Sequence, residues 1–338
     1  KASGQRIPRV RVTGIGRGAY ASVYPRYKTV EHGATFTHAE NQVLQVLVEW
    51  GPVFGLFFLG AFALTFFLGL SRARQSYSMG GCLAGIFAVS AHNLVDFNLE
   101  VGGVALPFVL VLGIVVASPF SHAGGPRDFE TKLRIPRWAG IGLAAAALAL
   151  AAVCVPYAGA HSLERDTRAL LALDDPAPAE PCSDTPLGRA ACDLMRRHPA
   201  DYLAPLALGK AFLGARPPDV ERAGHWLAPA LYLNPTSALT HRLTGRALFL
   251  AGRREQAMTA YRLAARWDPG VLTGTVVEVL RLSGDPQASL MATPDNPQAL
   301  LKVARLLRNL GKDAAAAKAA RRALELDSTL VPAIALLG

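Results

Sequence analysis

Long apolar stretches without charged residues dominate the first half of the chain. They cover four segments, at residues 53–70, 79–95, 101–120 and 138–157. A helix needs about 20 mostly apolar residues to cross a hydrocarbon core of ~30 Å. The pattern therefore predicts four transmembrane helices within residues 52–157. Trp138 and Tyr157 flank the fourth stretch, as in the aromatic belts of membrane interfaces.

Basic residues follow alternate stretches and predict the orientation of the helices. The first and third stretches are each followed by a basic loop, with Arg72 and Arg74 in one and Arg127, Lys132, Arg134 and Arg137 in the other. Cytoplasmic loops are enriched in Lys and Arg, so residues 71–78 and 119–137 are expected inside. Residues 1–51, 96–100 and 158–338 are then expected outside.

A different pattern begins after residue 200, where helical segments repeat. Asn234-Pro235 and Asp268-Pro269 are 34 positions apart, which is the period of a tetratricopeptide helix pair. A further unit is expected at 297–329, and 270–296 is a shortened, degenerate unit. The small and aromatic contact positions include Gly245, Ala257, Tyr261, Ala264, Ala304, Gly311 and Ala323. The expected fold is all-α, with polytopic transmembrane helices followed by an α-solenoid at 200–338.

Repeats of this kind stack to bury a shared core and leave a concave surface. That surface predicts either a docking site for a protein partner or a purely structural scaffold, and the sequence leaves both readings open. Residues 158–199 form a linker and helical lead-in, with a Pro-rich part at 174–186.

Composition adds charge and cysteine chemistry to this picture. The chain has 338 residues, is 51% hydrophobic and carries a net charge of +10. Basic cytoplasmic loops account for much of this charge, and no nucleic-acid partner is expected. Cys182 and Cys192 either form a disulfide in an oxidising compartment or remain two free thiols. Cys82 and Cys154 are expected to be packing residues within the membrane.

The expected outer loop, residues 1–51, is unusually basic for that side of a membrane. Its cations either bind an anionic ligand, since Arg matches phosphate oxygens, or reflect a weak charge bias in a long loop. Gly14-Ile15-Gly16-Arg17-Gly18 lacks the ending of a phosphate-binding loop and is better interpreted as a turn that carries Arg17. Seven basic residues precede His38, against the single acid Glu31: Lys1, Arg6, Arg9, Arg11, Arg17, Arg26 and Lys28.

Two polar groups adjoin the apolar stretches. Residues 38–51 predict a helix that enters the membrane, with Asn41, Gln45 and Glu49 on one face and His38 at its start. A histidine there is either a general base near neutral pH or a structural hydrogen-bonding group. His92, Asn93 and Asp96 form the second group. His92 and Asp96 are four positions apart, so on a helix they are expected to pair.

Three pieces of the chain together resemble the O-antigen ligase/polymerase family of cell-surface polysaccharide enzymes. Their order relative to the apolar stretches carries the resemblance, which covers roughly residues 10–120, and several family members also have a tetratricopeptide tail. The pieces are Gly14-Ile15-Gly16-Arg17-Gly18-Ala19-Tyr20 with Tyr24-Pro25-Arg26-Tyr27; His38-Ala39-Glu40-Asn41 through Leu44-Gln45 to Glu49-Trp50-Gly51; and His92-Asn93-Leu94-Val95-Asp96-Phe97.

The resemblance implies a polytopic glycosyltransferase of the GT-C type, a multi-pass protein of the bacterial inner membrane with its C-terminal domain in the periplasm. Such an enzyme moves a glycan from undecaprenyl pyrophosphate to a lipid acceptor such as lipid A-core, with neither a metal ion nor a cofactor. It implies that His38 is the catalytic base and that Arg17 and Arg26 bind the leaving pyrophosphate. Asn41, Glu49, His92 and Asp96 are the remaining substrate-binding candidates.

Two departures from the family pattern qualify this reading. Many members have His directly before the Asn, where this chain has Glu40, so either His38 or Glu40 is the expected base. The family has about a dozen spans against the four expected here, and the chain alone is therefore expected to be inactive. The alternatives are an O-antigen or exopolysaccharide polymerase and a non-enzymatic membrane-anchored scaffold.

Overall fold

The structure, a computed structural model, is helical and divides into two compact units. The first unit contains residues 1–21 and 36–165, and the second contains residues 22–35 and 166–338. The structure describes residues 14–16, 18–28, 36–73, 77–96, 98–117, 163–173, 182 and 185–337. The predicted span at 138–157, the basic loop at 119–137, Arg17 and most of the Pro-rich segment lie outside these residues.

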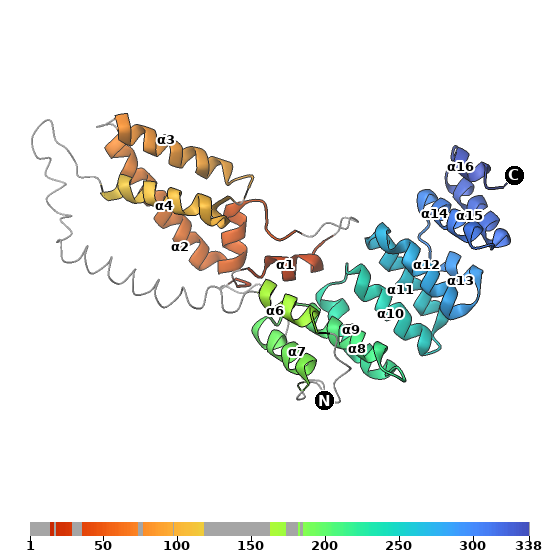
Figure 1. The fold of residues 1–338 in the computed structure, drawn as a ribbon. Helices are drawn as coiled ribbons and strands as arrows, with labels where there is room; N and C mark the ends of the chain where they lie inside the picture. The colour runs from red at the N-terminus through yellow and green to blue at the C-terminus, as the bar shows by residue number, and fades with distance from the viewer. Residues whose placement is uncertain are drawn as a thin grey trace, which may run out of the picture. The chain divides into compact units, whose positions relative to one another are not determined.

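In the described residues of the first unit, three apolar helices pack together (Figure 1). They are α2 (Gln42–Ala73), α3 (Tyr77–His92) and α4 (Gly102–Ala117), and the short helix η2 (Asn98–Glu100) connects α3 to α4. Leu83 and Ile86 of α3 pack on Phe108 and Val115 of α4 in a small core. The Phe62 and Phe108 rings stack at 5.9 Å, which joins α2 to the same core.

The outward faces of these helices expose large apolar side chains, such as Phe57 (77% exposed) and Leu110 (67% exposed). Within the described part of the chain, one helical stretch, Gln42–Leu64, is long and apolar enough to cross a membrane. This criterion concerns length and composition alone. The predicted second and third spans coincide with α3 and α4, which have 16 residues each. Such helices are about 24 Å long.

Helix α2 is broken near its start, which the sequence pattern did not predict. Gly51 has φ 80° and ψ 163°, a conformation open to glycine and strained for other residues. Pro52 follows and has no N–H to donate to the carbonyl of Val48. A short helix therefore runs up to Trp50, and the long apolar helix begins after the break.

Helix pairs with a shared core form the second unit (Figure 1). The pairs are α8 with α9, α10 with α11, and α14 with α15. The predicted degenerate repeat corresponds to α12 with the short helix α13. The second unit contains α7 (Pro186–Arg197), α8 (Leu203–Gly214), α9 (Val220–Leu233), α10 (Ala238–Leu250), α11 (Arg254–Trp267), η4 (Pro269–Val271), α12 (Leu272–Ser283), α13 (Pro286–Met291), α14 (Pro297–Asn309), α15 (Asp313–Leu326) and α16 (Val331–Ile334), together with most of α6 (Leu163–Leu171).

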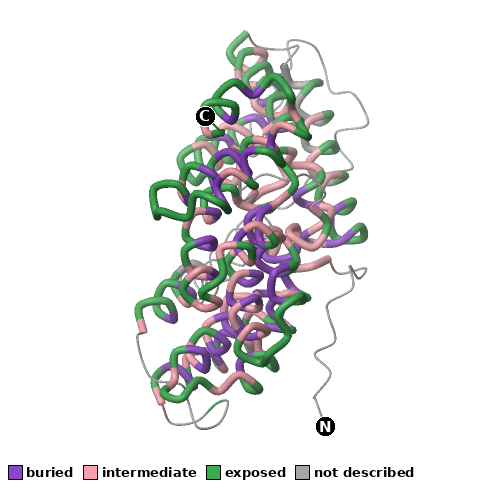
Figure 2. The backbone as a smooth tube through the Cα atoms, turned by 90° about the vertical axis from the view of Figure 1, so that its right-hand side faces the viewer, coloured by how far each residue is buried: buried purple, intermediate pink, exposed green. Residues whose placement is uncertain are grey.

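Small side chains allow the paired helices to approach closely. Tyr261 of α11 is fully buried, and its ring lies against Gly245 of α10, where a Cβ atom would be 3.0 Å from the ring. Ala316, Ala319 and Ala320 of α15 are also buried. Buried and exposed positions alternate along the repeat helices, as Figure 2 shows, which is the pattern of a solenoid core.

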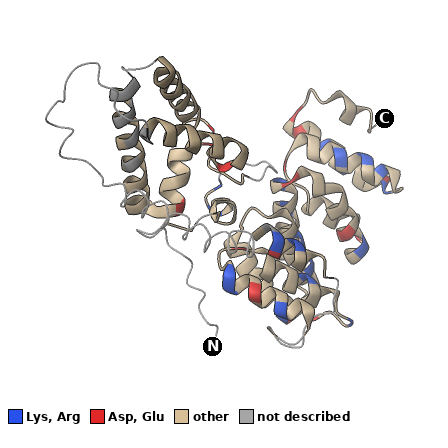
Figure 3. Cartoon of the chain, turned by 60° about the vertical axis from the view of Figure 1, so that its left-hand side comes forward, with Lys and Arg blue, Asp and Glu red and all other residues tan. Residues whose placement is uncertain are grey.

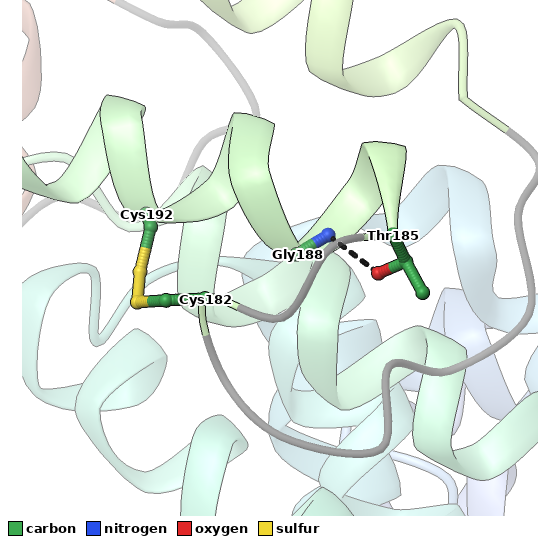
Figure 4. Close-up of a disulfide and its surroundings, with 4 residues drawn as sticks. All are labelled: Cys182, Thr185, Gly188 and Cys192. Atoms are coloured by element: carbon green, nitrogen blue, oxygen red, sulfur yellow. Dashed lines mark hydrogen bonds between the residues drawn. A yellow bond between two sulfur atoms is a disulfide. The ribbon is translucent and has the colours of Figure 1, made fainter.

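The two cysteines of the expected outer domain are joined in a disulfide (Figure 4). Cys182 precedes α7 and Cys192 lies within it, with Cα atoms 5.3 Å apart. The Thr185 hydroxyl accepts a hydrogen bond from the Gly188 N–H and caps the same helix. The sequence left open a disulfide or two free thiols for this cysteine pair, and the structure contains the disulfide.

Candidate functional site

The second piece of the family resemblance folds over the start of α2. The helix begins at Gln42, so His38, Glu40 and Asn41 precede it, whereas the sequence predicted a helix from His38. Asn41 caps the helix, because its side-chain oxygen accepts the Leu44 N–H at 2.9 Å. Glu40 has φ 50°, a left-handed conformation that directs the chain into the cap and that a continuous helix could not contain.

Two of the three residues on the predicted polar face of this segment, Gln45 and Glu49, are buried. Gln45 is 2% exposed and Glu49 is 3% exposed. The side-chain oxygen of Gln45 accepts the Ala39 N–H at 2.8 Å, which holds the residues next to His38 against the first turns of the helix. These side chains position the segment that carries the two base candidates.

His38 is half-buried at this end of the helix, and Glu40 is exposed. The Nδ1 atom of His38 lies 3.0 Å from the Thr37 hydroxyl. In the tautomer with the proton on Nδ1, Nδ1–H donates to Thr37 and Nε2 carries the lone pair that can accept a proton. The geometry is therefore compatible with a general base. The same geometry is also compatible with the alternative, in which His38 only makes a structural hydrogen bond to Thr37.

The third piece of the resemblance forms the turn after α3. His92 Nε2 lies 3.1 Å from Asp96 Oδ2, so the predicted pair is present. The pair is solvent-accessible, with His92 58% exposed at its side chain. Asn93 is buried; its side-chain N–H group donates to the Val89 carbonyl at 2.7 Å and its side-chain oxygen accepts the Leu99 N–H at 3.1 Å.

Hydrogen bonds join these two pieces of the chain. The Gln42 N–H donates to the Asn93 carbonyl at 2.9 Å, and the Asn41 side chain donates to the Leu94 carbonyl at 2.6 Å. The Gln42 side chain also donates to Glu100 at 3.0 Å. The start of α2 and the end of α3 thus form one polar junction (residues 38–49 and 92–100).

The first piece of the resemblance reaches the same junction through the break in α2. The Ile15 N–H donates to the Val48 carbonyl at 3.0 Å, and the Gly16 N–H donates to the Glu49 carbonyl at 3.0 Å. Pro52 cannot satisfy the Val48 carbonyl, so the loop supplies the missing donor. The approach is close, because a Cβ on Gly14 would lie 2.3 Å from the Glu49 oxygen.

The two arginine candidates for the pyrophosphate site, Arg17 and Arg26, lie in different parts of the chain. Arg17 lies outside the described residues, one position after the Gly16 contact. Arg26 belongs to the second unit, where its guanidinium lies 4.5 Å from the centre of the Tyr232 ring. The structure thus brings together His38, Glu40, Asn41, Glu49, His92 and Asp96 within one unit, and places Arg26 on the repeats.

Sequence reasoning did not select Gln42 or Glu100, which join the two polar groups. They are 58 positions apart and belong to no local pattern, so no periodicity could have paired them. The described residues contain no group of three His, Cys, Asp or Glu side chains that could hold a metal ion.

Comparison with known proteins identifies one part of the chain. Residues 297–330, which contain α14 and α15, match the model of the tetratricopeptide repeat family. No curated protein matches the chain. The match and the stacked helix pairs identify the second unit as a domain with tetratricopeptide-like repeats.

Proposed function

We propose that this chain is part of an O-antigen ligase-like glycosyltransferase of the bacterial inner membrane. One observation carries the proposal: residues 15 and 16 of the first piece and the turn of the third piece both hydrogen-bond to the second piece around the start of α2, although the pieces are separate in sequence.

The proposed membrane setting rests on the surface of the first unit. The helices of this unit expose apolar side chains on their outward faces. Their described residues include few charged side chains, whereas the repeat helices have many (Figure 3). A bilayer would cover such faces at no cost in desolvated charge. The disulfide supports a periplasmic position for the second unit, because disulfides persist in oxidising compartments.

In the proposed reaction, His38 Nε2 accepts the proton of an acceptor hydroxyl. The hydroxyl oxygen then forms a bond to the anomeric carbon of the glycan, and the bond from that carbon to undecaprenyl pyrophosphate breaks. Arg17 compensates the negative charge of the leaving pyrophosphate. Glu40 is the alternative base. His92 and Asp96, whose pair is solvent-accessible, are proposed to contact the sugar or the acceptor.

Complementation of a deletion strain with variants of the complete gene would test this proposal. His38→Ala and Glu40→Ala would be compared with His225→Ala, which removes an exposed imidazole from α9. We expect loss of long-chain surface glycan in one of the first two variants at normal protein level, and an unchanged glycan in the control. Unchanged glycan in both site variants would refute the proposed site.

The same strains separate a ligase from a polymerase. A ligase variant would accumulate full-length glycan on the undecaprenyl carrier, because chain growth would precede the lost step. A polymerase variant would instead accumulate single repeat units. Mass spectrometry of the extracted lipid-linked glycans would distinguish these products.

A second candidate function, a membrane-anchored scaffold, is favoured by the tetratricopeptide match. A groove of about 790 Å³ beside α13 and α15 includes Lys318 and Arg321 in its lining and is a candidate partner surface. Lys318→Glu with Arg321→Glu would abolish function if the chain were a scaffold, whereas His38→Ala would not. The enzyme proposal expects the reverse result.

A further inference from the structure

Charge is distributed unevenly between the two helices of the repeat pairs. The first helices, α8, α10, α12 and α14, contain seven Lys and Arg residues and a single acid, Glu278. The second helices, α9, α11, α13 and α15, contain seven basic residues as well, but four acids accompany them. The first helices therefore form the more strongly positive surface, which favours an anionic partner.

The single acid of this surface lies in a cluster where α10 meets α12. Arg242 Nε lies 3.4 Å from Glu278 Oε2, and the Tyr261 hydroxyl donates to Glu278 Oε1 at 3.4 Å. Arg246 follows Arg242 by four positions, so the two arginines share a face of α10. Burial raises the pKa of Tyr261, and the charge of Glu278 raises it further, whereas Arg246 and Arg242 oppose the rise. Both guanidinium groups thus act on one hydroxyl, and we call these four residues the paired-arginine site.

Two arginines share one carboxylate in the paired-arginine site. A guanidinium group has five N–H donors, and an ionised carboxylate has two oxygen atoms. Among the described residues, the buried Nε atoms of Arg242 and Arg246 have no hydrogen-bond partner. The paired-arginine site therefore has more donors than acceptors and an excess of positive charge. A further carboxylate would balance that charge, whereas a phosphate group, with up to two negative charges, would exceed it.

The Arg242 guanidinium is accessible from solvent. Its side chain is 34% exposed, compared with 14% for Glu278. Gly274 of α12 is exposed beside it, and a Cβ atom there would lie 3.7 Å from Arg242 Nη1. Any other residue at position 274 would therefore place a side chain next to the guanidinium, and glycine leaves the approach open.

Exposed aliphatic side chains flank the paired-arginine site. Leu239 is 45% exposed and precedes Arg242 by three positions on α10. Val277 is 44% exposed and follows Gly274 by three positions on α12. Residues three positions apart share a helix face, so an apolar group is present on each helix beside the arginines. These neighbours suit the apolar side chain of a peptide better than sugar hydroxyls, which would lose hydrogen bonds to water there.

We propose that the paired-arginine site binds an acidic peptide segment of a partner protein. The carboxylate of an Asp or Glu side chain accepts N–H groups of the two arginines, and an adjacent apolar residue lies against Leu239 or Val277. The partner is therefore a protein that exposes an acidic residue next to an apolar one. The paired-arginine site shares no residue with the groove beside α13 and α15, and the inference does not depend on the proposed reaction.

An array of random decapeptides, probed with the complete chain in nanodiscs of neutral lipid, tests the proposal. We expect the bound peptides to be enriched in Asp or Glu next to an apolar residue. The best-bound peptide is then compared by fluorescence polarisation with a counterpart in which Asn and Gln replace Asp and Glu. The uncharged counterpart should bind at least about tenfold more weakly. A selection without acidic residues, or equal affinity for both peptides, would overturn the proposal.

Three variants that lower the net charge by the same amount locate the binding. Gly274→Glu places a carboxylate of the chain itself next to Arg242 and should weaken peptide binding about tenfold or more. Arg242→Gln removes one guanidinium and should have a similar effect. Arg189→Gln changes an exposed position on α7 and, as the matched control, should alter the affinity by less than about twofold. Glu is a good helix former at an exposed position, so Gly274→Glu keeps the fold intact. Equal losses in all three variants would show a nonspecific effect of charge and refute the site.

Glu278→Gln provides a readout that a purely structural cluster would not give. The amide oxygen still accepts the Tyr261 hydroxyl, but the competing carboxylate is removed. The acidic peptide should therefore bind about threefold or more tightly, and unchanged or weaker binding would contradict the proposed competition.

A second probe separates a peptide from a lipid surface. Vesicles of phosphatidylglycerol should bind wild type and Gly274→Glu equally. Binding that Gly274→Glu abolishes, with no acidic peptide selected, would replace the peptide by a lipid headgroup and overturn the proposal. No glycan takes part in these measurements, so unchanged glycan in the His38→Ala and Glu40→Ala strains would refute the proposed reaction and leave the peptide result to stand or fall separately.

Discussion

Phe57 on α2 and Tyr261 on α11 have side chains of similar size in opposite surroundings. Phe57 is 77% exposed, whereas Tyr261 is fully buried. Leu110 on α4 and Leu307 on α14 show the same contrast, at 67% and 0% exposed. The repeat unit thus buries its apolar surface internally, while the first unit leaves much of it facing outward. Helix formation alone does not distinguish a unit that buries its apolar surface from one that exposes it, whereas the direction in which the apolar faces point does.

The largest predicted effect contrasts the two aromatic residues directly. Tyr261→Ala leaves a cavity beside Gly245 and should lower the free energy of unfolding of the repeat unit by about 3–5 kcal/mol. Phe57→Ala removes an exposed ring and should change stability by less than about 0.5 kcal/mol in detergent. Hydrogen exchange of α11 and α2 in the complete chain measures both. Equal losses in the two variants would contradict the comparison.

The disulfide provides the next largest effect. Cys192→Ser opens a loop whose ends are ten positions apart and should cost about 3 kcal/mol in the chain-entropy model. Faster exchange should appear in α7, while helices α2 to α4 keep their exchange rates. Cys82→Ser is the matched control, because Cys82 is a free thiol in the first unit.

A smaller effect is expected at the break in α2. Gly51→Ala places a Cβ atom on a backbone with φ 80° and should cost about 1–3 kcal/mol. The Ile15 and Gly16 amides should then exchange faster, because their acceptors move. Gly60→Ala adds a methyl group on the same helix with no atom within 4 Å, and it should leave those amides unchanged.

The smallest predicted effect is one of pH. Burial lowers the pKa of His241, whose Nε2 lies 2.8 Å from the Pro235 carbonyl. Between the lowered folded pKa and the ordinary value of about 6.5, the unfolded chain binds the proton more strongly. The stability of the repeat unit should therefore fall as pH falls below about 6.5. Denaturation of wild type and His241→Gln at several pH values measures this, and an equal slope in both would contradict it.

The repeat phase was predictable from sequence, because the Asn-Pro and Asp-Pro pairs mark the ends of α9 and α11. The His92–Asp96 pair was also predictable from a local pattern, since residues at positions i and i+4 share a helix face. The start of α2 was not. Asn41 caps the helix and also donates to the Leu94 carbonyl in the turn after α3, and Glu40 is left-handed, whereas the periodicity indicated a helix from His38.

Contacts between distant segments were beyond sequence reasoning. Nothing in a basic loop indicates that Ser22 meets Asp201 or that Arg26 covers Tyr232. The guanidinium of Arg26 lies over the Tyr232 ring, and the phosphate contact expected from its charge stays a prediction. The structure brings the predicted polar residues around His38 into one unit, and their role as a site stays a prediction. Gln42 and Glu100, which join the two polar groups, were not selected from the sequence.

The break at Gly51-Pro52 has a consequence for which substitutions the chain can accept. Pro52→Ala would restore an N–H at position 52, and a helix continued through the break would use it to compete with Ile15 for the Val48 carbonyl. A proline at position 15 would do the opposite and leave that carbonyl with no donor at all. The residues at positions 15 and 52 are therefore not independent. A change at either position alters what the other can be, although a helix start and a loop separate them in sequence.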